Sequence, residues 1–483
     1  MKRVARYLLF LGLTTGLLHA CKVGRNYTGM EVRTPEQFRD NLLVEDTTAL
    51  AGIAGNDSLD WWRLFRDPVL DSLVHEALRN NRDLNAAVLR IDQAAAALAI
   101  SKADLAPKIG VQGDYTWGNY PIFFDDEPRT NVFGGGVVAW ELDLWGRIRR
   151  LNEAARADLL GTQQAVRGLQ LEVVSAVAST YFQLLEFETD LGISRETLAL
   201  RDSMLTIIQA RFDGGIAAEI ELDQAKIQRA IAAAAVPQYE RRIATTEHAL
   251  SILVGRAPGP VTTGIALTDQ PPVPEIPVGL PSELLKRRPD ILSAEQAVVA
   301  QNAVAGAAVA QRFPTISLTG LLGVASADLA GFTSGTTAYS ATGGLFGPLF
   351  YWGQNKRRVE IERLRTEQAA LAYEQTVLEA LGEVQDALVT IRTLKDEQVA
   401  RQAHVDAAVH AQFLSQERYD KGVTSYLEAL ESQRQAFESQ LFLAGVRRQL
   451  LQNHVLLYKA LGGGWPTQER RPKAQNHTGG LPV

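Results

Sequence analysis

Several features that identify common classes of protein are missing from this chain. Cys21 is the only cysteine among 483 residues, so no intrachain disulfide can form. The net charge is only −6 and no basic block is present, which argues against a nucleic-acid partner. After the N-terminal segment, no apolar run reaches the roughly 18 residues that a membrane-spanning helix needs. Any membrane crossing by the rest of the chain must therefore use strands.

Catalytic motifs are also missing. The histidines form no His-x-x-x-His pair, and the chain has no G-x-S-x-G, Walker or Rossmann glycine motif. His404 and His410 lie six residues apart, so they do not share a helix face. The acidic run Asp125-Asp126-Glu127 is interpreted as an exposed loop, with an ion site as the alternative. We predict a protein that is not an enzyme and has neither a cofactor nor a metal site.

The N-terminus has the layout of a secretory signal peptide. Three basic residues precede the apolar run 7–18, and residues 19–21 read His-Ala-Cys, as at a cleavage site. We predict a signal peptide at 1–20 and an exported mature chain.

The position of Cys21 resembles the lipobox of bacterial lipoproteins. This resemblance implies a diacylglycerol and an acyl chain on Cys21, which would anchor an N-terminal segment at 21–66 to a membrane. His19 is bulkier than the usual lipobox residue, so an ordinary signal with an incidental cysteine is the alternative. Lys22 is not the aspartate that usually retains lipoproteins on the inner membrane.

The chain repeats itself at a constant offset of 207 residues. Separate clusters of identical or similar residues keep this offset without a gap. Two copies of so long a unit indicate a duplicated domain and not a solenoid of short repeats. The matching positions are Leu78 and Leu285, Asp83 and Asp290, Ala87 and Ala294, Pro107 and Pro314, Ile109 and Ile316, Trp145 and Trp352, Gly146 and Gly353, Arg211 and Arg418, Asp213 and Asp420, Gly215 and Gly422, Glu221 and Glu428, and Gly255 and Gly462.

The first copy, residues 67–255, has the pattern of helix, β-hairpin, long helix and helix. Apolar residues at helical spacing predict one helix over 67–106. Alternation of polar and apolar residues then predicts a hairpin within 108–145. Over 147–213 nothing interrupts a helical pattern, which is far longer than a globular helix. A last helix follows over 219–254.

The second copy, residues 284–462, has the same order. We predict a helix over 284–312, a hairpin within 315–351 and a long helix over 353–420, before a final helix. In the long helix, apolar residues step by sevens, threes and fours, which predicts a coiled-coil seam. The seam residues are Leu364, Leu371, Leu378, Leu381, Val384, Leu388, Ile391 and Leu394.

Two segments lie outside the copies. Residues 256–283 are rich in proline and are interpreted as a linker between the copies. Residues 463–483 are interpreted as a disordered tail.

Both hairpins have one polar and one apolar face. The chain offers four strands, whereas the smallest transmembrane barrels have about eight, and an open edge in lipid leaves backbone groups unpaired. If the strands cross a membrane, several chains must pool them around a wet lumen. The alternative is half-buried strands of a soluble α+β domain. The polar positions are Gln112, Asp114, Thr116, Thr315, Ser317 and Thr319.

A series of short motifs runs along the mature chain. These are Trp61-Trp62, Phe65-x-Asp67-Pro68, Asn80-Asn81-Arg82-Asp83-Leu84, Asp143-Leu144-Trp145-Gly146-Arg147, Arg287-Arg288-Pro289-Asp290-Ile291 and Ala294-Glu295, with the two glycine turns. In this order they resemble the TolC-type bacterial outer-membrane efflux channels, within the lipoprotein branch that serves resistance-nodulation-division (RND) pumps. The resemblance covers essentially the whole mature chain.

The resemblance implies an α+β membrane protein with a specific assembly. It implies a homotrimer in which a twelve-stranded outer-membrane β-barrel continues into a periplasmic α-helical barrel. It also implies three kinds of partner: outer-membrane lipid, a periplasmic adaptor (membrane fusion) protein and a proton-driven inner-membrane RND transporter. The implied function is a passive exit duct for small molecules or metal ions. The alternatives are a helical envelope lipoprotein that forms no pore, and a duct for type I protein secretion.

The same resemblance places the two glycine turns at the periplasmic tip of the tunnel. It implies acidic rings at the pore entrance and a tyrosine whose hydroxyl helps to lock the closed state. Thr424 stands where some members have an arginine, so a salt bridge from that position is not implied. The residues that match these roles are Glu428, Glu431, Glu221 and Tyr419, with Gly215 and Gly422 in the turns.

Some of these residues also have local structural explanations. Ser425-x-x-Glu428 is a capping box, so Glu428 serves either as a helix cap or as a ring residue. Arg211 and Arg418 lie in the last turns of their helices, where a cation complements the helix dipole. Because the two copies differ around the turns, we expect the second copy to carry most of the gating. The differing positions are Ala217, Ala218 and Gln224 opposite Thr424, Ser425 and Glu431.

Overall fold

The computed structural model describes residues 22–38, 61–118, 129–274 and 281–463. The predicted signal peptide, Cys21, the acidic run at 125–127 and nearly all of the predicted tail lie outside these residues, so those predictions are untested.

The described chain forms two compact units, each with segments from both sequence copies. Unit 1 comprises Met1–Val32, Ala87–Ala165 and Leu292–Thr376, and contains a β-sheet with adjoining helical segments. Unit 2 comprises Arg33–Ala86, Val166–Ile291 and Val377–Val483, and its regular structure is helical.

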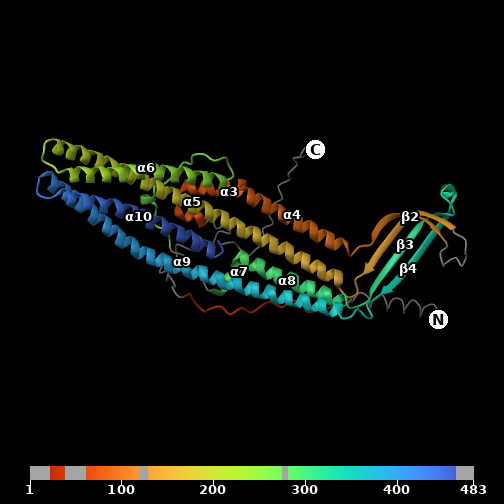
Figure 1. Ribbon diagram of the computed structural model, residues 1–483. Helices are drawn as coiled ribbons and strands as arrows, with labels where there is room; N and C mark the ends of the chain where they lie inside the picture. Colours follow the sequence, from red (N-terminus) through yellow and green to blue (C-terminus); the bar gives the residue numbers. More distant parts are fainter. Residues whose placement is uncertain (1–21, 39–60, 119–128, 275–280, 464–483) are drawn as a thin grey trace. The chain divides into compact units, whose positions relative to one another are not determined.

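Unit 1 contains a four-stranded antiparallel sheet in the order β1-β2-β3-β4 (Figure 1). The strands are β1 (Lys108–Gly118), β2 (Arg129–Leu142), β3 (Thr315–Ser326) and β4 (Thr336–Phe346). The central pair, β2 and β3, joins the hairpin of the first copy to that of the second. The strands β1 and β4 form the two edges. A short 3₁₀ turn, η5 (Phe332–Ser334), lies between β3 and β4.

The strand register places the predicted polar positions on one face, which also carries Val137 and Leu321, and most of the apolar residues on the other. Ile109 pairs with Val138, and Trp140 pairs with Leu318, so these residues share one face. Ser317 opposes Gly344 on the other face, because successive residues of a strand alternate. Gln112, Asp114, Thr116, Thr315 and Thr319 fall on that same second face.

Two helices of 67 residues each follow the hairpins. Helix α5 spans Arg147–Asp213, the range that the sequence predicts, and α9 spans Gln354–Asp420. The helices α6 (Glu219–Leu253) and α10 (Tyr426–Ala460) run back from their turns. Of the helices in the described ranges, none combines the length and apolar character that a membrane-spanning helix requires.

The prediction of one uninterrupted helix before each hairpin is wrong. The first copy has α3 (Pro68–Asn80) and α4 (Arg82–Ala103), and the second has α7 (Leu284–Arg287) and α8 (Pro289–Ala310). The helices break at Asn81 and Arg288, which are 207 residues apart and have extended ψ angles of 127° and 123°.

Tertiary hydrogen bonds explain both breaks. The Asn81 side chain donates to the Leu253 carbonyl over 2.9 Å and accepts from the Leu84 N–H, so it caps the next helix. The Arg288 side chain donates to the Ala460 carbonyl over 3.1 Å, and Ala460 is the equivalent of Leu253. The proline that follows Arg288 further disfavours a helical conformation there. Each break therefore fastens the start of a helix to the end of the same copy.

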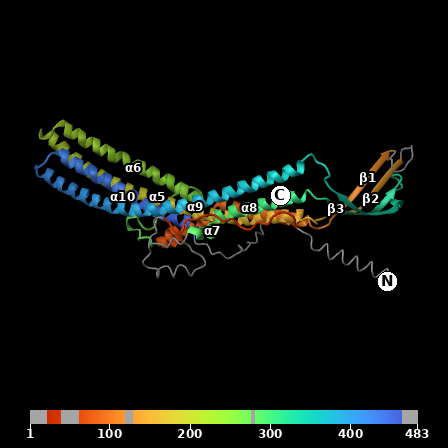
Figure 2. The same cartoon turned by 90° about the horizontal axis from the view of Figure 1, so that it is seen from below.

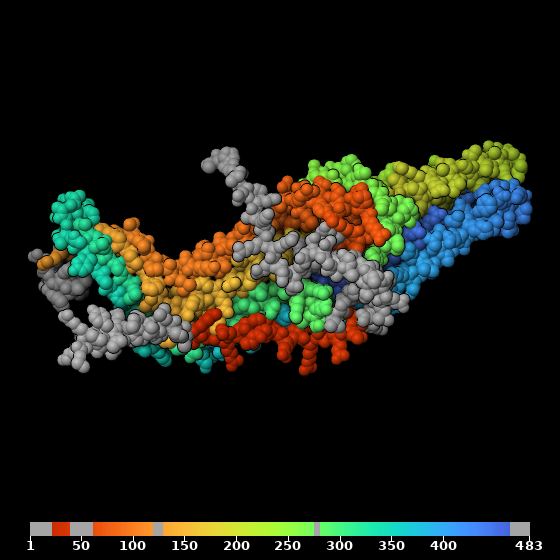
Figure 3. All heavy atoms as spheres, turned by 180° about the vertical axis from the view of Figure 1, so that it is seen from behind, coloured from red at the N-terminus to blue at the C-terminus, as the bar shows by residue number. Residues whose placement is uncertain are grey.

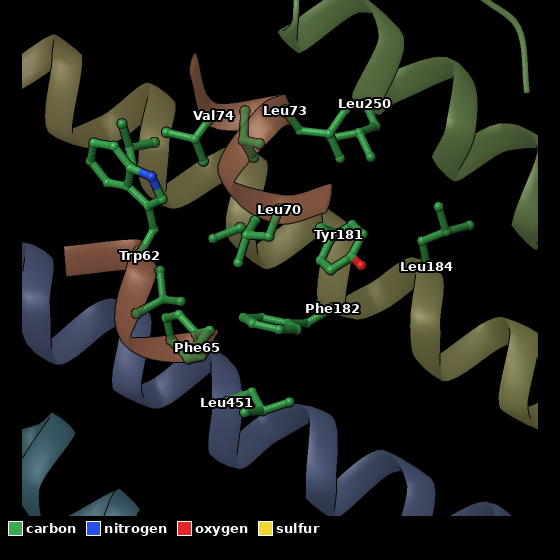
Figure 4. Packing of buried hydrophobic residues seen from close by; sticks show 14 of the residues in the cluster. Trp62, Phe65, Leu70, Leu73, Val74, Tyr181, Phe182, Leu184, Leu250 and Leu451 are labelled. Atoms are coloured by element: carbon green, nitrogen blue, oxygen red, sulfur yellow. The ribbon is translucent and has the colours of Figure 1, made fainter. Parts of the chain in front are cut away.

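The core of unit 2 gathers side chains from the 3₁₀ turn η1 (Trp61–Phe65), α3, α5, α6 and α10 (Figure 4). Trp61 stacks on Tyr458 with ring centroids 5.3 Å apart, and Phe65 lies against Phe182 at 4.9 Å. Burial of large aromatic side chains contributes most of the hydrophobic stabilisation in such a cluster.

A buried aspartate connects this core to the linker. Asp67 caps α3 by accepting from the Val69 and Leu70 N–H groups, and its carboxylate also accepts from the Tyr181 hydroxyl over 2.6 Å. The Tyr181 oxygen in turn accepts from the Gly264 N–H over 2.9 Å. The predicted linker thus contains an ordered segment, which includes η3 (Leu267–Asp269) and leads towards η4 (Pro281–Glu283).

The predicted coiled-coil seam is buried only in its second part. Leu381, Val384, Leu388, Ile391 and Leu394 are buried within unit 2. By contrast, the first three residues of the seam keep 54%, 65% and 58% of their surface exposed, so no part of the described chain covers them. These exposed residues are Leu364, Leu371 and Leu378.

The start of the described chain, residues 22–32, lies along helices of unit 1 (Figure 3, red). Arg150 is fully buried and donates to the carbonyls of Val23 and Gly24 over 3.1 and 2.8 Å. Lys22 pairs with Glu153, and the Val23 N–H donates to the Trp145 carbonyl over 3.1 Å. The beginning of the described chain is therefore fixed beside the junction of β2 and α5.

Candidate functional site at the helical turns

The turns after α5 and α9 lie at the same end of unit 2 (Figures 1 and 2). Gly215 and Gly422 both have φ of 71°, in the left-handed region that favours glycine. The Ile216 N–H donates to the Arg211 carbonyl and the Val423 N–H to the Arg418 carbonyl, each over 2.8 Å. These bonds satisfy carbonyls at the helix ends, so the two copies form the same C-terminal cap.

A small hydrophobic cluster joins the two turns. It contains residues from the ends of α5 and α9 and from the starts of α6 and α10. The cluster fixes the two helical hairpins against each other near their turns. Its members are Met204, Ile208, Leu222, Ala225, Tyr419, Tyr426 and Ala429.

Tyr419 lies inside this cluster and contacts a cation from the other copy. Only 5% of Tyr419 is exposed, and its ring lies 5.6 Å from that of Tyr426. The Arg211 guanidinium lies 4.6 Å from the centre of the Tyr419 ring, within the range of a cation–π interaction. The structure thus brings the predicted tyrosine together with Arg211 through its ring.

Glu428 does not form the predicted capping box. Ser425 is the N-cap residue of α10, but within the described chain its side chain forms no cap hydrogen bond. Glu428 instead accepts from the Thr424 hydroxyl and pairs with Arg418 over 3.2 Å. The carboxylate is drawn across the turn because a cation at the end of α9 offers a stronger partner than a backbone N–H. Arg418 therefore pairs with an acid as well as complementing the helix dipole.

Glu431 lies on α10 next to an arginine that the sequence interpretation did not consider. Arg434 donates to Glu431 over 2.6 Å and also pairs with Glu438 over 2.9 Å. The hydrogen bond from Arg434 lowers the pKa of the Glu431 carboxyl to about 2. Because such a depressed pKa favours the charged form, Glu431 stays ionised down to about pH 2 and its charge is balanced by Arg434. The spacing of three residues on one helix was the available signal for this pair.

Glu221 lies in the first turn of α6, whose N-cap residue is Ala218. Its carboxylate acts on Tyr426 of the other copy: burial raises the pKa of Tyr426 to about 12, and the negative charge of Glu221 adds to the rise. Glu221 therefore lies close enough to Tyr426 for its charge to act on that hydroxyl.

Aliphatic side chains cover the outer surface of both turns. Ile216 and Val423 are 81% and 66% exposed, and Ile220 and Leu427 are 63% and 59% exposed. Each pair is related by the 207-residue offset. The site therefore combines an apolar surface, five charged side chains from the second copy, and a tyrosine whose ring contacts an arginine.

A family model described as outer membrane efflux protein matches residues 73–256 and again residues 280–463. The chain belongs to the outer membrane efflux protein family. The two matches begin and end 207 residues apart, which is the offset found in the sequence. The predicted family and the predicted outer-membrane location are confirmed.

Individual relatives cover nearly the whole chain. The antibiotic efflux pump outer membrane protein ArpC of Pseudomonas putida is 31% identical, with 98% of each chain covered. The cation efflux system protein CusC of Escherichia coli is 31% identical, with 93% of this chain and 96% of the relative covered. The crystal structure of the Campylobacter jejuni CmeC outer membrane channel has a TM-score of 0.85 at 26% identity, with 93% and 96% covered. This outer membrane efflux protein is thus the channel component of an efflux system.

In this efflux protein, the contact between Arg211 and Tyr419 should stabilise the turns. Replacing Arg211 by Met removes the charge but keeps the length of the side chain. At about 1 kcal/mol for the cation–π interaction, amide hydrogen exchange at Ile216 and Val423 should become roughly fivefold faster. The matched control is Arg195→Met, which removes an exposed ion pair with Glu240. Equal exchange in the two variants would show that Arg211 does not hold the turn.

Proposed function

We propose that this efflux protein acts as a trimer, in which three chains contribute four strands each to a twelve-stranded barrel in the outer membrane. The observation that carries this proposal is the four-stranded sheet with edges at β1 and β4. In lipid, unpaired backbone groups at these edges would cost several kcal/mol each, so β4 of one chain must pair with β1 of the next. Closure of the sheet removes both edges.

The residues on the two faces of the sheet indicate which face would contact lipid and which would line the lumen of this barrel. The face with Ile109, Val138, Trp140 and Leu318 is placed towards lipid, and the face with Gln112 and the other polar residues towards a wet lumen. Aromatic residues such as Tyr115 and Trp117 lie on the lipid side, where they suit the membrane interface.

The exposed leucines of α9 support contacts between copies. Leu364, Leu371 and Leu378 repeat every seven residues, so they form one stripe along the helix. A neighbouring copy would cover this stripe, and three chains would then enclose a helical tunnel below the barrel.

The proposed partners are a periplasmic adaptor protein and an inner-membrane RND transporter. ArpC belongs by its description to an efflux pump and CusC to a cation efflux system, which supports a place for this chain in a multi-component exporter. The channel itself would perform no catalysis, and the transporter would supply the energy. The descriptions of ArpC and CusC cover both antibiotic and cation export, so small molecules or metal ions are the proposed cargo. A type I protein-secretion duct is the second candidate.

Acylation of Cys21 is proposed as an additional membrane anchor. The contacts of Lys22 and Val23 hold the residues after Cys21 beside Trp145, three residues beyond the end of β2. Lipid chains attached at Cys21 would therefore start next to the membrane-facing sheet.

Mass spectrometry of the mature N-terminal peptide tests this anchor. The peptide that begins at Cys21 should carry a diacylglycerol and an acyl chain, and Cys21→Ser should lose both masses. An unmodified N-terminus at residue 21 in the wild-type protein would rule out the anchor.

The acids near the turns are proposed to set ion preference at the periplasmic entrance. Glu428 and Glu431 lie three residues apart on α10, and a trimer would place six such carboxylates around its axis. The positive charges of their partners Arg418 and Arg434 reduce the negative potential of these carboxylates in each chain. The second copy contributes these residues, which supports its larger role in gating.

Conductance across a planar bilayer tests both the duct and its acids. Purified wild-type protein should give discrete channels with a preference for cations. Combined Glu428→Gln and Glu431→Gln should lower the cation-to-anion permeability ratio roughly twofold, whereas Arg434→Gln should raise it because Glu431 loses its counter-charge.

Glu240→Gln on α6, which removes an exposed acid paired with Arg195, is the control. A protein without conductance would contradict the duct and favour an envelope scaffold. Channels with the same selectivity in all variants would retain the duct and exclude the acidic ring.

A further inference from the structure

A groove of about 400 Å³ lies on the face of the sheet that carries Trp140 and Leu318. Three small residues of β3 and β4 also line it, and β4 is an edge strand, so the groove reaches the edge of the sheet. The Trp140 ring is fixed because its indole N–H donates to the Leu105 carbonyl over 2.9 Å. The small lining residues are Gly320, Ala341 and Gly343.

The register between β2 and β3 predicts how two copies of the chain would join at this edge. β4 is the equivalent of β2, and β1 is the equivalent of β3, because each pair of strands begins 207 residues apart. Gly136 of β2 pairs with Leu322 of β3. If two copies repeat this contact, Gly343 of one copy lies opposite Tyr115 of the next.

The resulting register matches large residues with small ones along the apolar face. It places Ala341 opposite Trp117, and Leu345 opposite Gly113, in addition to the pair of glycine and tyrosine. Cross-strand pairs of this kind are the contacts that stabilise a sheet. Within one chain the large side chains are mostly exposed, at 64% for Tyr115, 69% for Trp117 and 72% for Leu345.

Other registers lose this match. A shift of one residue would bring the polar face of β1 next to the apolar face of β4. A shift of two residues in one direction pairs Gly343 with Gly113, and in the other direction it pairs Leu345 with Tyr115. The register of β2 and β3 is therefore the one that suits both edges.

The connection after β4 supports the same contact. Trp145, which follows β2, donates its indole N–H to the Pro314 carbonyl over 2.7 Å. Its equivalent Trp352 is 86% exposed, and the equivalent of Pro314 is Pro107, directly before β1. Repeating the contact between copies would join Trp352 to Pro107 of the next copy.

We propose that a second copy of this chain fills the groove, with β4 of one copy paired to β1 of the next in the register of β2 and β3. The rings of Tyr115 and Trp117 of the next copy then lie over Gly343 and Ala341, as aromatic residues commonly cover glycines of a neighbouring strand. This inference rests on the proposed trimer and adds its register and contact residues.

Disulfide cross-linking in isolated outer membranes tests the register. The register places Thr342 opposite Thr116, and directly paired residues have Cα atoms about 4.5–5.5 Å apart, within disulfide range. Thr342→Cys combined with Thr116→Cys should therefore give covalent dimers and trimers on mild oxidation.

The matched controls displace one cysteine by two residues. Thr342→Cys with Asp114→Cys, and Gly344→Cys with Thr116→Cys, should cross-link at least tenfold less. The single variants Thr342→Cys and Thr116→Cys measure the background from Cys21. Trimers on native gels whose main cross-link is a displaced pair, or that form none, would overturn the register and retain the proposed trimer. Monomers would overturn both.

Thermal dissociation of the trimer on gels tests the aromatic contact. Gly343→Leu should lower the dissociation temperature by several degrees, because leucine takes the space of the Tyr115 ring. Within one chain a Cβ atom at Gly343 would lie 3.7 Å from Leu318 Cδ2, an ordinary contact. Tyr115→Ala should lower the temperature as well, and combining it with Gly343→Leu should restore most of the loss.

Leu322→Ala is the control for this series, since Leu322 is 64% exposed on the same face but belongs to a central strand. It should leave the dissociation temperature unchanged. Additive losses in the Gly343→Leu and Tyr115→Ala double variant would show that the ring does not lie over Gly343.

Discussion

Backbone pairing in the four-stranded sheet is the constraint on which the rest of this protein depends. Each chain satisfies the hydrogen bonds between β1 and β2, β2 and β3, and β3 and β4, and has β1 and β4 at the edges of its sheet. In the proposed barrel, these edges are paired by other copies. The duplication supplies these four strands from two hairpins that meet at β2 and β3. The proposed assembly rests on this number of strands, because four strands are too few to close a transmembrane barrel.

In the helical part, the two copies also make equivalent contacts, but with different side chains. Asn81 and Arg288 reach equivalent carbonyls, of Leu253 and Ala460, one through an amide and the other through a guanidinium. At the turns the backbone caps are the same in both copies, but the ion pairs differ. The second copy pairs Arg418 with Glu428 and Arg434 with Glu431, whereas the first copy pairs Lys226 with Asp223 and Arg229 with Asp202. The backbone geometry is therefore conserved between the copies, and the charged side chains have diverged around it.

How far the sequence alone predicts this structure depends on whether a feature is local. The bounds of α5 could be predicted because an uninterrupted helical pattern and a glycine turn define them. The breaks at Asn81 and Arg288 could not, since both depend on carbonyls more than 150 residues away in the chain. The capping box at Ser425 failed for a different reason, because Arg418 at the end of the preceding helix pairs with Glu428 across the turn. The pair Glu431 and Arg434 is local and was open to prediction, whereas the contact of Arg211 with the Tyr419 ring required the packing of the two copies.

The central claim is that separate chains complete one closed sheet. Electron cryomicroscopy of the full-length protein extracted from outer membranes tests it most directly. The account predicts three copies around one axis, with β4 of each chain hydrogen-bonded to β1 of the next, twelve strands in total, and the polar face of the sheet turned inwards. Monomers with unpaired β1 and β4, or an assembly with the face of Ile109 and Trp140 turned towards the lumen, would contradict it.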